Sequence, residues 1–461
     1  MPSPPPSPPP SPPPSPPPSP PPSSLPLPAA RDVAAAEAFV GDHLGAVVAG
    51  EVAASPRFRG GQIAADAVLA SLDVTGYAAS RNEVWPAERR GASAISPYVR
   101  HGLLSLPLVW DAVADAPPRD RQKFRDELLW QEHARHLYAR LGAATRHGLR
   151  RELTGTPWNP ATTTAAADGP TADNRPAPEP DATPGAAPGA APVWDPAMAC
   201  LDVTTEELTT DGYLVNQTRM WLASHWAVRA GVDWRAGEDE FFRHLLDGSR
   251  AANRAGWQWT IGTGTGKPYG FSRWQVEKRA PGLCATCPLV DACPIDDWPE
   301  DPPLPAAEEH PKLRRDDDPA ATAGPKSPHI DGDAEVVWLT AESLGDDDPA
   351  LAAHPDLPAI FVFDAPLLAR LQLSGKRLVF LTECLADLAE RRELTVHLGD
   401  PVEVLADRRL AVTYAPVPGW QQRSQRLEVV ATHPWPWLVP PHGGSVASFS
   451  AWRKAARGGR R

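Results

Sequence analysis

The sequence lacks three features that mark common protein classes: a long apolar run, an excess of basic residues and a large number of cysteines. No apolar run reaches membrane-spanning length, and the N-terminus lacks the basic start and apolar core of a secretion signal. The net charge of −12 excludes a protein that binds nucleic acid over its whole surface, although a local basic groove remains compatible with it. We therefore expect a cytoplasmic protein without membrane contact, whose 5 cysteines are metal ligands or core residues rather than disulfides.

Proline is abundant instead, and its 57 residues are concentrated in a few segments that divide the chain. PPPS repeats make residues 1–30 an extended, disordered tail, and a stretch of Ala, Thr, Pro and Gly predicts a disordered insertion at 159–192. Helical periodicity on both sides of the insertion predicts one helical domain in two parts, 31–158 and 193–299. A linker rich in Pro and Asp spans residues 300–329.

Residues 330–461 have a different pattern. Short β-rich runs occur at 335–339, 359–363 and 394–398, and a helical stretch at 376–391 separates the last two. Strands that alternate with helices predict a parallel, Rossmann-like sheet. The expected fold is therefore multidomain, with an all-α domain followed by a smaller α/β domain. The basic residues at 453–461 predict a solvated C-terminal end.

The most informative stretch is DGSRAANRAGWQW, residues 247–259. It combines a carboxylate, an amide and two tryptophans, which suits a buried flavin that needs a polar group at its reactive nitrogen and an aromatic electron donor nearby. The stretch resembles the flavin-binding signature of the DNA photolyase and cryptochrome family. The resemblance covers residues 37–298 and implies that the helical domain is an FAD-binding domain of photolyase type.

The resemblance also implies which residues hold the flavin. Arg219 and Asp247 match an ion pair beside the flavin ring, and Asn253 matches the residue that faces its N5 atom. The segments YAASRN (77–82) and SAISPY (93–98) resemble the part that holds the diphosphate, where hydroxyls and N–H groups at a helix start suit phosphate oxygens. They contribute Tyr77, Ser93, Ile95 and Ser96. The chain departs from the family where Ala92 replaces a threonine and Ser249 an aspartate.

Aromatic residues in the same domain resemble the family's electron-transfer chain and its lesion cavity. Trp257 and Trp234 resemble the first two members of the tryptophan chain that photoreduces the flavin, and Trp194 is the candidate for the third. Glu127 and Trp130, three residues apart on one helix face, resemble the pair that contacts a damaged base pair. The matching residues of the opposite cavity wall are Asn216, Met220 and Trp259. A flipped dimer suits such an apolar cavity with a few polar edges.

Four cysteines form a separate motif: Cys200, Cys284, Cys287 and Cys293. Their spacing suits either zinc or an iron–sulfur cluster. With MAC at 198–200 and KPYGFS at 267–272, they resemble the iron–sulfur bacterial cryptochromes and photolyases, which implies a [4Fe–4S] cluster; zinc and free thiols are the alternatives. That subgroup includes (6-4) repair enzymes, so the lesion type stays open.

Residues 330–461 resemble the light-harvesting domain that precedes the FAD domain in photolyases, so the resemblance implies a circular permutation. No antenna chromophore is assigned, and this domain could be structural.

The function that follows is FAD-dependent, light-driven repair of cyclobutane pyrimidine dimers by a monomer that binds damaged DNA. The alternative is a cryptochrome-like blue-light photoreceptor that binds FAD without repair, favoured by Ser249, Gln131 and Gln217 where photolyases carry charged residues. A degenerate flavoprotein with a structural cluster is the third hypothesis.

Overall fold

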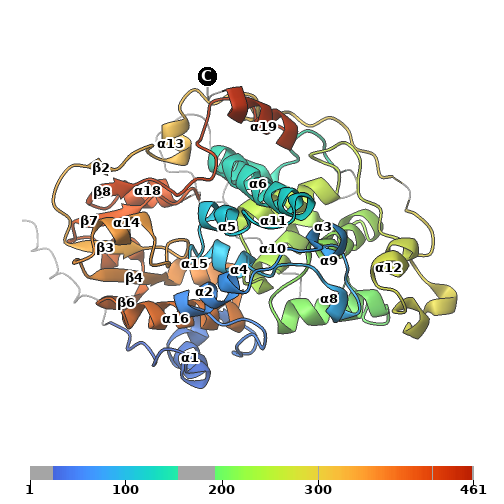
Figure 1. Cartoon of the computed structure of the whole chain (residues 1–461), viewed down its shortest axis with the longest axis horizontal. Helices are drawn as coiled ribbons and strands as arrows, with labels where there is room; N and C mark the ends of the chain where they lie inside the picture. Colours follow the sequence, from blue (N-terminus) through green and yellow to red (C-terminus); the bar gives the residue numbers. More distant parts are fainter. Residues whose placement is uncertain (1–23, 154–192, 300, 418, 459–461) are drawn as a thin grey trace, which may run out of the picture.

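The computed structural model describes residues 24–153, 193–299, 301–417 and 419–458. The predicted insertion at 159–192 lies outside these ranges, as does most of the predicted tail at 1–30. Figure 1 shows a sheet with its covering helices on one side of the molecule and a larger, helical region on the other. Within the described ranges, every helix is too short or too polar to cross a membrane.

The helical region is built around α6 (Pro118–Leu141), whose 24 residues confirm the amphipathic helix expected from the sequence. One face of α6 packs against α11 and α3, because its buried apolar residues recur at helical spacing. The other helices of this region are α2 (Gln62–Ala70), α3 (Tyr77–Ser80), α4 (Ser96–Arg100), α5 (Leu106–Ala112), α8 (Ala199–Thr210), α9 (Asn216–Ser224), α10 (Trp234–His244), α11 (Arg250–Thr260) and α12 (Arg273–Arg279).

The sheet has six strands in the order β2-β8-β7-β3-β4-β6, and all neighbours are parallel except β2 and β8. Its strands are β2 (His329–Ile330), β3 (Val336–Leu339), β4 (Ala359–Asp364), β6 (Leu394–Gly399), β7 (Leu410–Thr413) and β8 (Val429–His433). The three predicted strands correspond to β3, β4 and β6, and the predicted helix between the last two is α16 (Gly375–Ala389). The parallel core of the sheet is therefore confirmed, whereas β7 and β8 were not expected.

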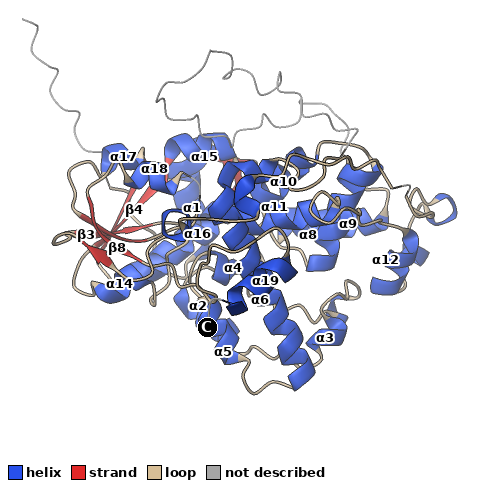
Figure 2. Cartoon of the chain, turned by 90° about the horizontal axis from the view of Figure 1, so that it is seen from above, coloured by secondary structure: helices blue, strands red, loops and turns tan. Residues whose placement is uncertain are grey.

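Both faces of the sheet are buried, as alternate residues of its strands show. Val337 and Phe361 belong to the main core with α16 and α14 (Pro349–Ala353), whereas Trp338 and Ile360 pack on the opposite face with Leu405 and Trp420. Figure 2 shows α17 (Pro401–Val404) and α18 (Trp420–Ser424) on the side of the sheet opposite α14. The remaining helix of this region is α15 (Ala365–Leu371).

The N-terminal segment joins the two regions. α1 (Val33–Phe39) packs against α16, and β1 (Val48–Ala49) pairs in parallel with β5 (Leu373–Ser374). Residues of the sheet and of the helical region consequently belong to one continuous core. The sheet region is thus fixed against the helical region by side-chain packing as well as by chain connections.

The C-terminal end is a helix that rests on the helical region. α19 (Phe449–Gly458) lies against α6, its Trp452 is 1% exposed, and Arg453 pairs with Asp126 at 2.9 Å. Lys454 and Arg457 of this helix are exposed to solvent. Residues 301–328 also lie along α6 and include α13 (Pro319–Ala323).

Candidate functional site

The centre of the candidate flavin site is an ion pair between α9 and the turn before α11. Nη2 of Arg219 lies 2.7 Å from Oδ2 of Asp247, and Nε of Arg219 donates to the carbonyl of Leu214 at 3.0 Å. Burial opposes the charge of the guanidinium, but Asp247 outweighs it and the pKa of Arg219 is raised. The second carboxylate oxygen of Asp247, Oδ1, is buried and has no hydrogen-bond partner in the described part of the chain.

α11 begins at this pair and carries the predicted N5-facing amide. Ser249 is its N-cap and accepts a hydrogen bond from the N–H of Ala252 at 3.1 Å, so the serine that replaces a family aspartate has a capping role. Asn253 is 5% exposed, and its Nδ2 has no partner among the described residues. A buried amide without a hydrogen-bond partner costs stability, so this atom is a candidate donor to a bound ligand.

The predicted diphosphate segment lies at the start of α3 and of α4. Tyr77 opens α3 and packs edge-on against Phe124 at 5.1 Å, while Ile95 is buried directly before Ser96, the first residue of α4. Between Ser93 and Ile95, Ala94 has a φ of 54°, a left-handed conformation that is strained for alanine and is typical of functional segments. The hydroxyls of Ser93 and Ser96, both partly buried, make no hydrogen bond to any other described residue.

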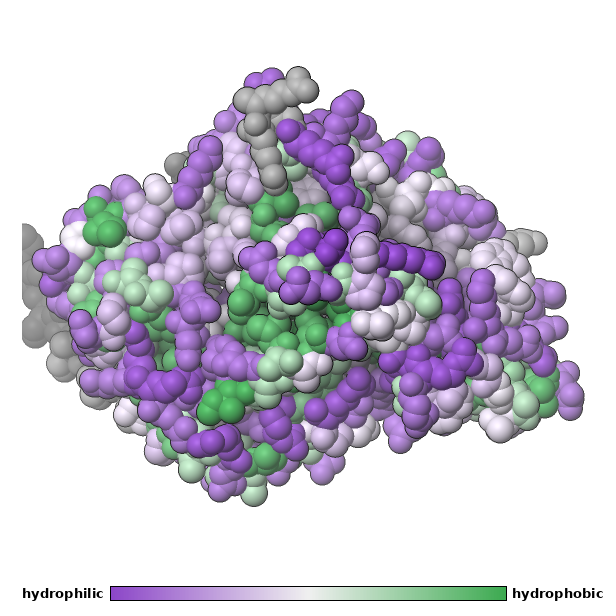
Figure 3. Space-filling model, viewed as in Figure 1, coloured by the Kyte–Doolittle hydropathy of each residue, from purple (hydrophilic) through white to green (hydrophobic). Residues whose placement is uncertain are grey.

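These residues fit FAD. The unpaired amide and carboxylate oxygen suit the polar edge of a flavin ring, and unpaired hydroxyls near a strained loop suit phosphate oxygens. Figure 3 shows apolar side chains gathered in a hollow near the middle of the molecule, in the region where Figure 1 draws α4 and α10. The chain thus offers polar contacts next to an apolar hollow.

The predicted lesion pair lies on the exposed side of α6. Oε1 of Glu127 lies 2.7 Å from Nζ of Lys123 and 3.3 Å from Nε of Arg81, so two cations hold its carboxylate. Trp130 is 41% exposed, but its ring is stacked on Phe449 of α19, with ring centres 4.0 Å apart and planes 12° apart. The C-terminal helix therefore covers part of the tryptophan that the resemblance assigns to the lesion.

The predicted opposite wall comes from α9 and α11. Asn216 is exposed at the first turn of α9, Met220 is partly buried one turn later, and Trp259 is 42% exposed with its ring 6.1 Å from Tyr269. Gln217, which stands where photolyases carry an arginine, points inward and donates to the hydroxyl of Tyr269 at 2.7 Å. Its side chain is thus engaged inside the protein.

Of the predicted electron-transfer tryptophans, Trp257 and Trp234 are buried and Trp194 is partly buried. Trp257 is 2% exposed and packs edge-on against Phe241 at 5.1 Å. Trp234 is also buried, but its ring lies beside the guanidinium of Arg235 at 4.9 Å. Trp194, expected only as a substitute, packs against Trp226 at 4.9 Å.

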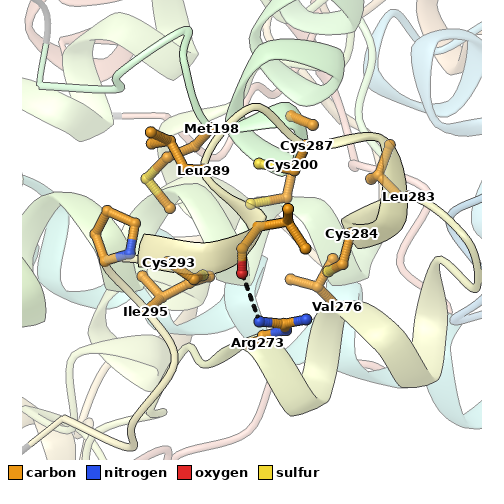
Figure 4. Close-up of a pocket in the computed structure, with 13 residues that line it drawn as sticks. Met198, Cys200, Arg273, Val276, Leu283, Cys284, Cys287, Leu289, Cys293 and Ile295 are labelled. Carbon is orange, nitrogen blue, oxygen red and sulfur yellow. Dashed lines mark hydrogen bonds between the residues drawn. The ribbon is translucent and has the colours of Figure 1, made fainter.

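The four cysteines of the predicted metal site line one apolar pocket (Figure 4). Cys200 comes from the first turn of α8, and the other three come from the loop after α12, which short 3-10 turns at Cys284–Thr286 and Val290–Ala292 fold back on itself. Arg273 fixes this loop by donating to the carbonyl of Val290 at 2.9 Å. In the described ranges, no group of three or more His, Cys, Asp or Glu side chains is arranged to hold a metal ion.

The thiols in this pocket raise one another's pKa. Burial, and then the neighbouring Cys284, Cys293 and Cys287, raise the pKa of Cys200 to about 12. Burial is also the main cause that raises the pKa of Cys284 to about 11. A metal bound by Cys200 and Cys284 would therefore have to displace their protons. Four thiols of this kind are a suitable donor set for a soft metal centre.

A second cavity, of about 270 Å³, lies between the sheet and the helical region. Its lining includes Trp338 and Phe363 at the carboxyl ends of β3 and β4, the place where open α/β sheets bind ligands. Arginines reach it from both regions, and burial together with Arg100 and Arg250 lowers the pKa of Arg377 to about 9. In the same lining Glu342 pairs with Arg100 and Asp364 with Arg423, so part of this positive charge is balanced.

Two residues that the sequence did not single out lie at the site: Phe449 on Trp130 and Trp226 beside Trp194. Each is distant in sequence from the partner that gives it a role. The apolar residues Phe449 and Trp452, three apart next to basic residues, were the signal for an amphipathic C-terminal helix.

Comparison with known proteins supports this picture. Residues 189–278, which include Arg219, Asp247 and Asn253, match the FAD binding domain of DNA photolyase. The chain is 28% identical over 205 residues to the deoxyribodipyrimidine photo-lyase of Synechococcus sp., covering 41% of this chain and 36% of that protein. It is 42% identical over 65 residues, 14% of either chain, to the enzyme of that name from Escherichia coli. A bacterial class III photolyase from Agrobacterium tumefaciens matches with a TM-score of 0.33 and 22% identity, over 47% of this chain and 42% of that one.

Residues 189–278 of the helical region match an FAD-binding domain, which supports FAD as the cofactor. Over this stretch the chain is similar to DNA photolyases, which supports the resemblance predicted from residues 247–259. It spans about a third of the length of the first curated relatives that it matches.

Proposed function

We propose that this protein is a light-driven, FAD-dependent enzyme that repairs cyclobutane pyrimidine dimers, and that it acts as a monomer on damaged DNA. The exposure of the two predicted lesion tryptophans is the observation that carries this proposal. Trp130 and Trp259 are 41% and 42% exposed; Trp85, Trp274 and Trp298, which are not predicted lesion contacts, are exposed as well. Exposed indoles cost stability unless they serve binding, and stacking on a nucleobase is worth about 1–3 kcal/mol.

Each residue around these tryptophans would make a different contact with a flipped lesion. The indole of Trp259 offers a stacking surface, and Asn216 and Glu127 offer hydrogen-bonding groups for the edges of the bases. Arg81 and Lys123 pair with the carboxylate of Glu127, which holds it in one orientation. Met220 adds an adaptable apolar contact.

The flavin itself supplies light absorption and one-electron chemistry when it is bound. Arg219, Asp247 and Asn253 would hold its ring, and Ser93 and Ser96 its phosphates. The protein contributes position and an environment that excludes water, since Asn253 is buried.

A repair assay tests the proposal. Protein reduced under anaerobic conditions is mixed with an oligonucleotide that contains one thymine dimer, and the return of thymine ultraviolet absorbance under blue light is followed. We expect light-dependent recovery, and none in the dark. Flavin-loaded protein that shows no recovery in the light would contradict the repair function.

Phe449 favours a second candidate function, that of a blue-light photoreceptor without repair activity. Its ring occupies one face of Trp130 at 4.0 Å, and Arg453 ties the same helix to Asp126 at 2.9 Å. A lesion that stacks on this face must first displace α19. A protein lacking residues 449–461 separates the two functions: gain of dimer repair by this variant alone supports the photoreceptor for the full chain, and equal repair by both supports the enzyme.

The cysteine pocket is proposed to hold a [4Fe–4S] cluster. The support is that Cys200 of α8 and three cysteines of the loop after α12 line one pocket whose other contacts are largely apolar. Iron and acid-labile sulfide, about four of each per chain after anaerobic purification, are expected. Cys287→Ser should lower both, while Cys384→Ser, a buried cysteine outside this pocket, should leave them unchanged. Zinc without sulfide in the native protein would contradict the cluster.

A further inference from the structure

The outward face of α19 is cationic. Its polar residues share one sector of the helix, about 100° wide at 100° per residue: Ser450, Arg453, Lys454 and Arg457. The opposite sector holds alanines and Trp452, which is 1% exposed. α19 contains no carboxylate, although the whole chain has a net charge of −12. The helix therefore gathers positive charge on one side.

This cationic face lies beside Trp130. Figures 1 and 2 both draw α19 next to α6, and the ring of Phe449 is stacked on Trp130 with ring centres 4.0 Å apart. Arg453 pairs with Asp126, one helical turn before Trp130, at 2.9 Å. The stack and the ion pair hold the cationic face next to the indole that the resemblance assigns to the lesion.

Most of the positive charge at the predicted lesion and flavin residues is already balanced. Arg81 and Lys123 both lie beside the carboxylate of Glu127, and Arg219 pairs with Asp247. The three residues predicted for the opposite wall of the lesion cavity are uncharged. A DNA phosphate near the lesion therefore meets little unbalanced positive charge on the cavity walls themselves.

Lys454 and Arg457 differ from these cations. Both side chains are exposed, and neither forms an ion pair or a hydrogen bond with another residue of the described ranges. The helix dipole favours a cation at Arg457 in the last turn, but it falls off before Lys454. Exposed cations without a carboxylate partner are free to bind phosphate oxygens and to release the counterions of DNA.

The apolar side of α19 is not available to a membrane. Basic amphipathic helices bind anionic lipid by burying their apolar face in the membrane interface. In α19 this face is occupied, because the buried ring of Trp452 lies 5.5 Å from that of His133 and 5.4 Å from that of His136. The free side offers charge alone, which suits the phosphates of a nucleic acid.

We propose that α19 is a DNA-backbone-binding helix, in which Lys454 and Arg457 bind phosphates next to the lesion. The inference rests on the proposed repair function and assigns phosphate contacts to the same site. Phosphate contacts carry no sequence information, so these two residues act on damaged and undamaged DNA alike. The exposed tryptophans supply the preference for the dimer, and α19 supplies affinity that depends on salt.

The salt dependence of DNA binding tests this assignment. Fluorescence anisotropy with a labelled duplex, with and without one thymine dimer, gives the affinity of the full-length protein at several salt concentrations. Each lost phosphate contact should make the slope of log K against log salt less steep by about 0.9. When Lys454→Gln and Arg457→Gln are combined, the affinity should therefore fall roughly tenfold less than that of wild type between about 50 and 200 mM salt.

A second pair of substitutions provides the matched control. Arg408 and Arg426 are exposed cations of the sheet region, so Arg408→Gln combined with Arg426→Gln removes the same charge and should keep the wild-type slope. Trp259→Ala should lower the preference for dimer DNA without changing the slope. The double variant of α19 should keep the wild-type midpoint in urea and the wild-type repair rate at saturating DNA, because its cations act on binding alone.

The outcomes separate the helix from the proposed function. A wild-type slope in the α19 double variant, or an equal change in the Arg408 and Arg426 control, overturns the assignment. It is also overturned if the double variant loses binding to phosphatidylglycerol vesicles while its DNA slope stays unchanged, since the helix then binds a membrane. If the slopes change as expected but flavin-loaded protein neither prefers nor repairs dimer DNA, the repair function fails and the DNA contact of α19 stands.

Discussion

Removing the Phe449 ring should expose the second face of Trp130 and strengthen the binding of damaged DNA. The two rings are stacked at 4.0 Å with planes 12° apart, and a stacked aromatic pair is worth about 0.5–1.5 kcal/mol beyond its buried area. A base that stacks on this face must first replace that contact. Phe449→Ala should therefore raise the affinity for dimer-containing DNA roughly 2- to 12-fold.

The variant should keep α19 in place, because Trp452 is 1% exposed and Arg453 remains paired with Asp126. Fluorescence anisotropy with a labelled oligonucleotide, with and without one dimer, measures the affinity at fixed salt. Trp130→Ala provides the matched background: the gain from Phe449→Ala should vanish there, since the two rings act on each other. The reasoning is refuted if Phe449→Ala leaves the affinity of the native protein unchanged. It is also refuted if Phe449→Ala gives the same gain in the Trp130→Ala background.

The remaining predictions concern the flavin contact, the packing of the indoles and the pH dependence of stability. Asn253→Ala should change the spectrum of the reduced flavin while FAD remains bound, and identical spectra would argue against contact with N5. Gly237→Ala should destabilise the protein by about 1–3 kcal/mol in urea denaturation, because its Cβ would overlap Trp257, whereas Gly256→Ala on α11 meets no atom within 4 Å and should be neutral or stabilising. His101 should make stability fall as the pH drops. Burial, then Arg100 and Arg377, lower its folded pKa to about 3 from its usual value of 6.5, so the unfolded chain binds a proton at a pH where the folded chain does not. His101→Gln should flatten the fall between pH 6.5 and 3 by up to ~1.4 kcal/mol per pH unit, and an unaltered slope would contradict this account.

The sequence predicted the elements whose signal is local. α6 shows 3.6-residue periodicity over 24 residues, and β3, β4 and β6 are short runs of β-branched and aromatic residues bounded by turns. The Arg219–Asp247 pair was predictable because the family pattern fixes both positions, and the structure places them 2.7 Å apart. β7 and β8 were not expected, since strands of 4 and 5 residues give a weak pattern.

Contacts between residues distant in sequence were not predictable. Phe449 and Trp130 meet only because residues 435–458 fold back onto α6, and basic residues around Trp452 gave the impression of a solvated end. Trp226 was one of 17 tryptophans, and only the absence of a side chain at Gly237 brings its ring near Trp257. Such pairings depend on tertiary packing that a single sequence does not display.

The flavin content of the purified protein tests the central claim most directly. FAD released by heat and quantified by fluorescence should approach one per chain in the native protein, and should fall at least tenfold when Asp247→Ala leaves the buried Arg219 without its partner. A protein that remains free of flavin after incubation with excess FAD, or an Asp247→Ala variant with a full complement of FAD, would contradict the account.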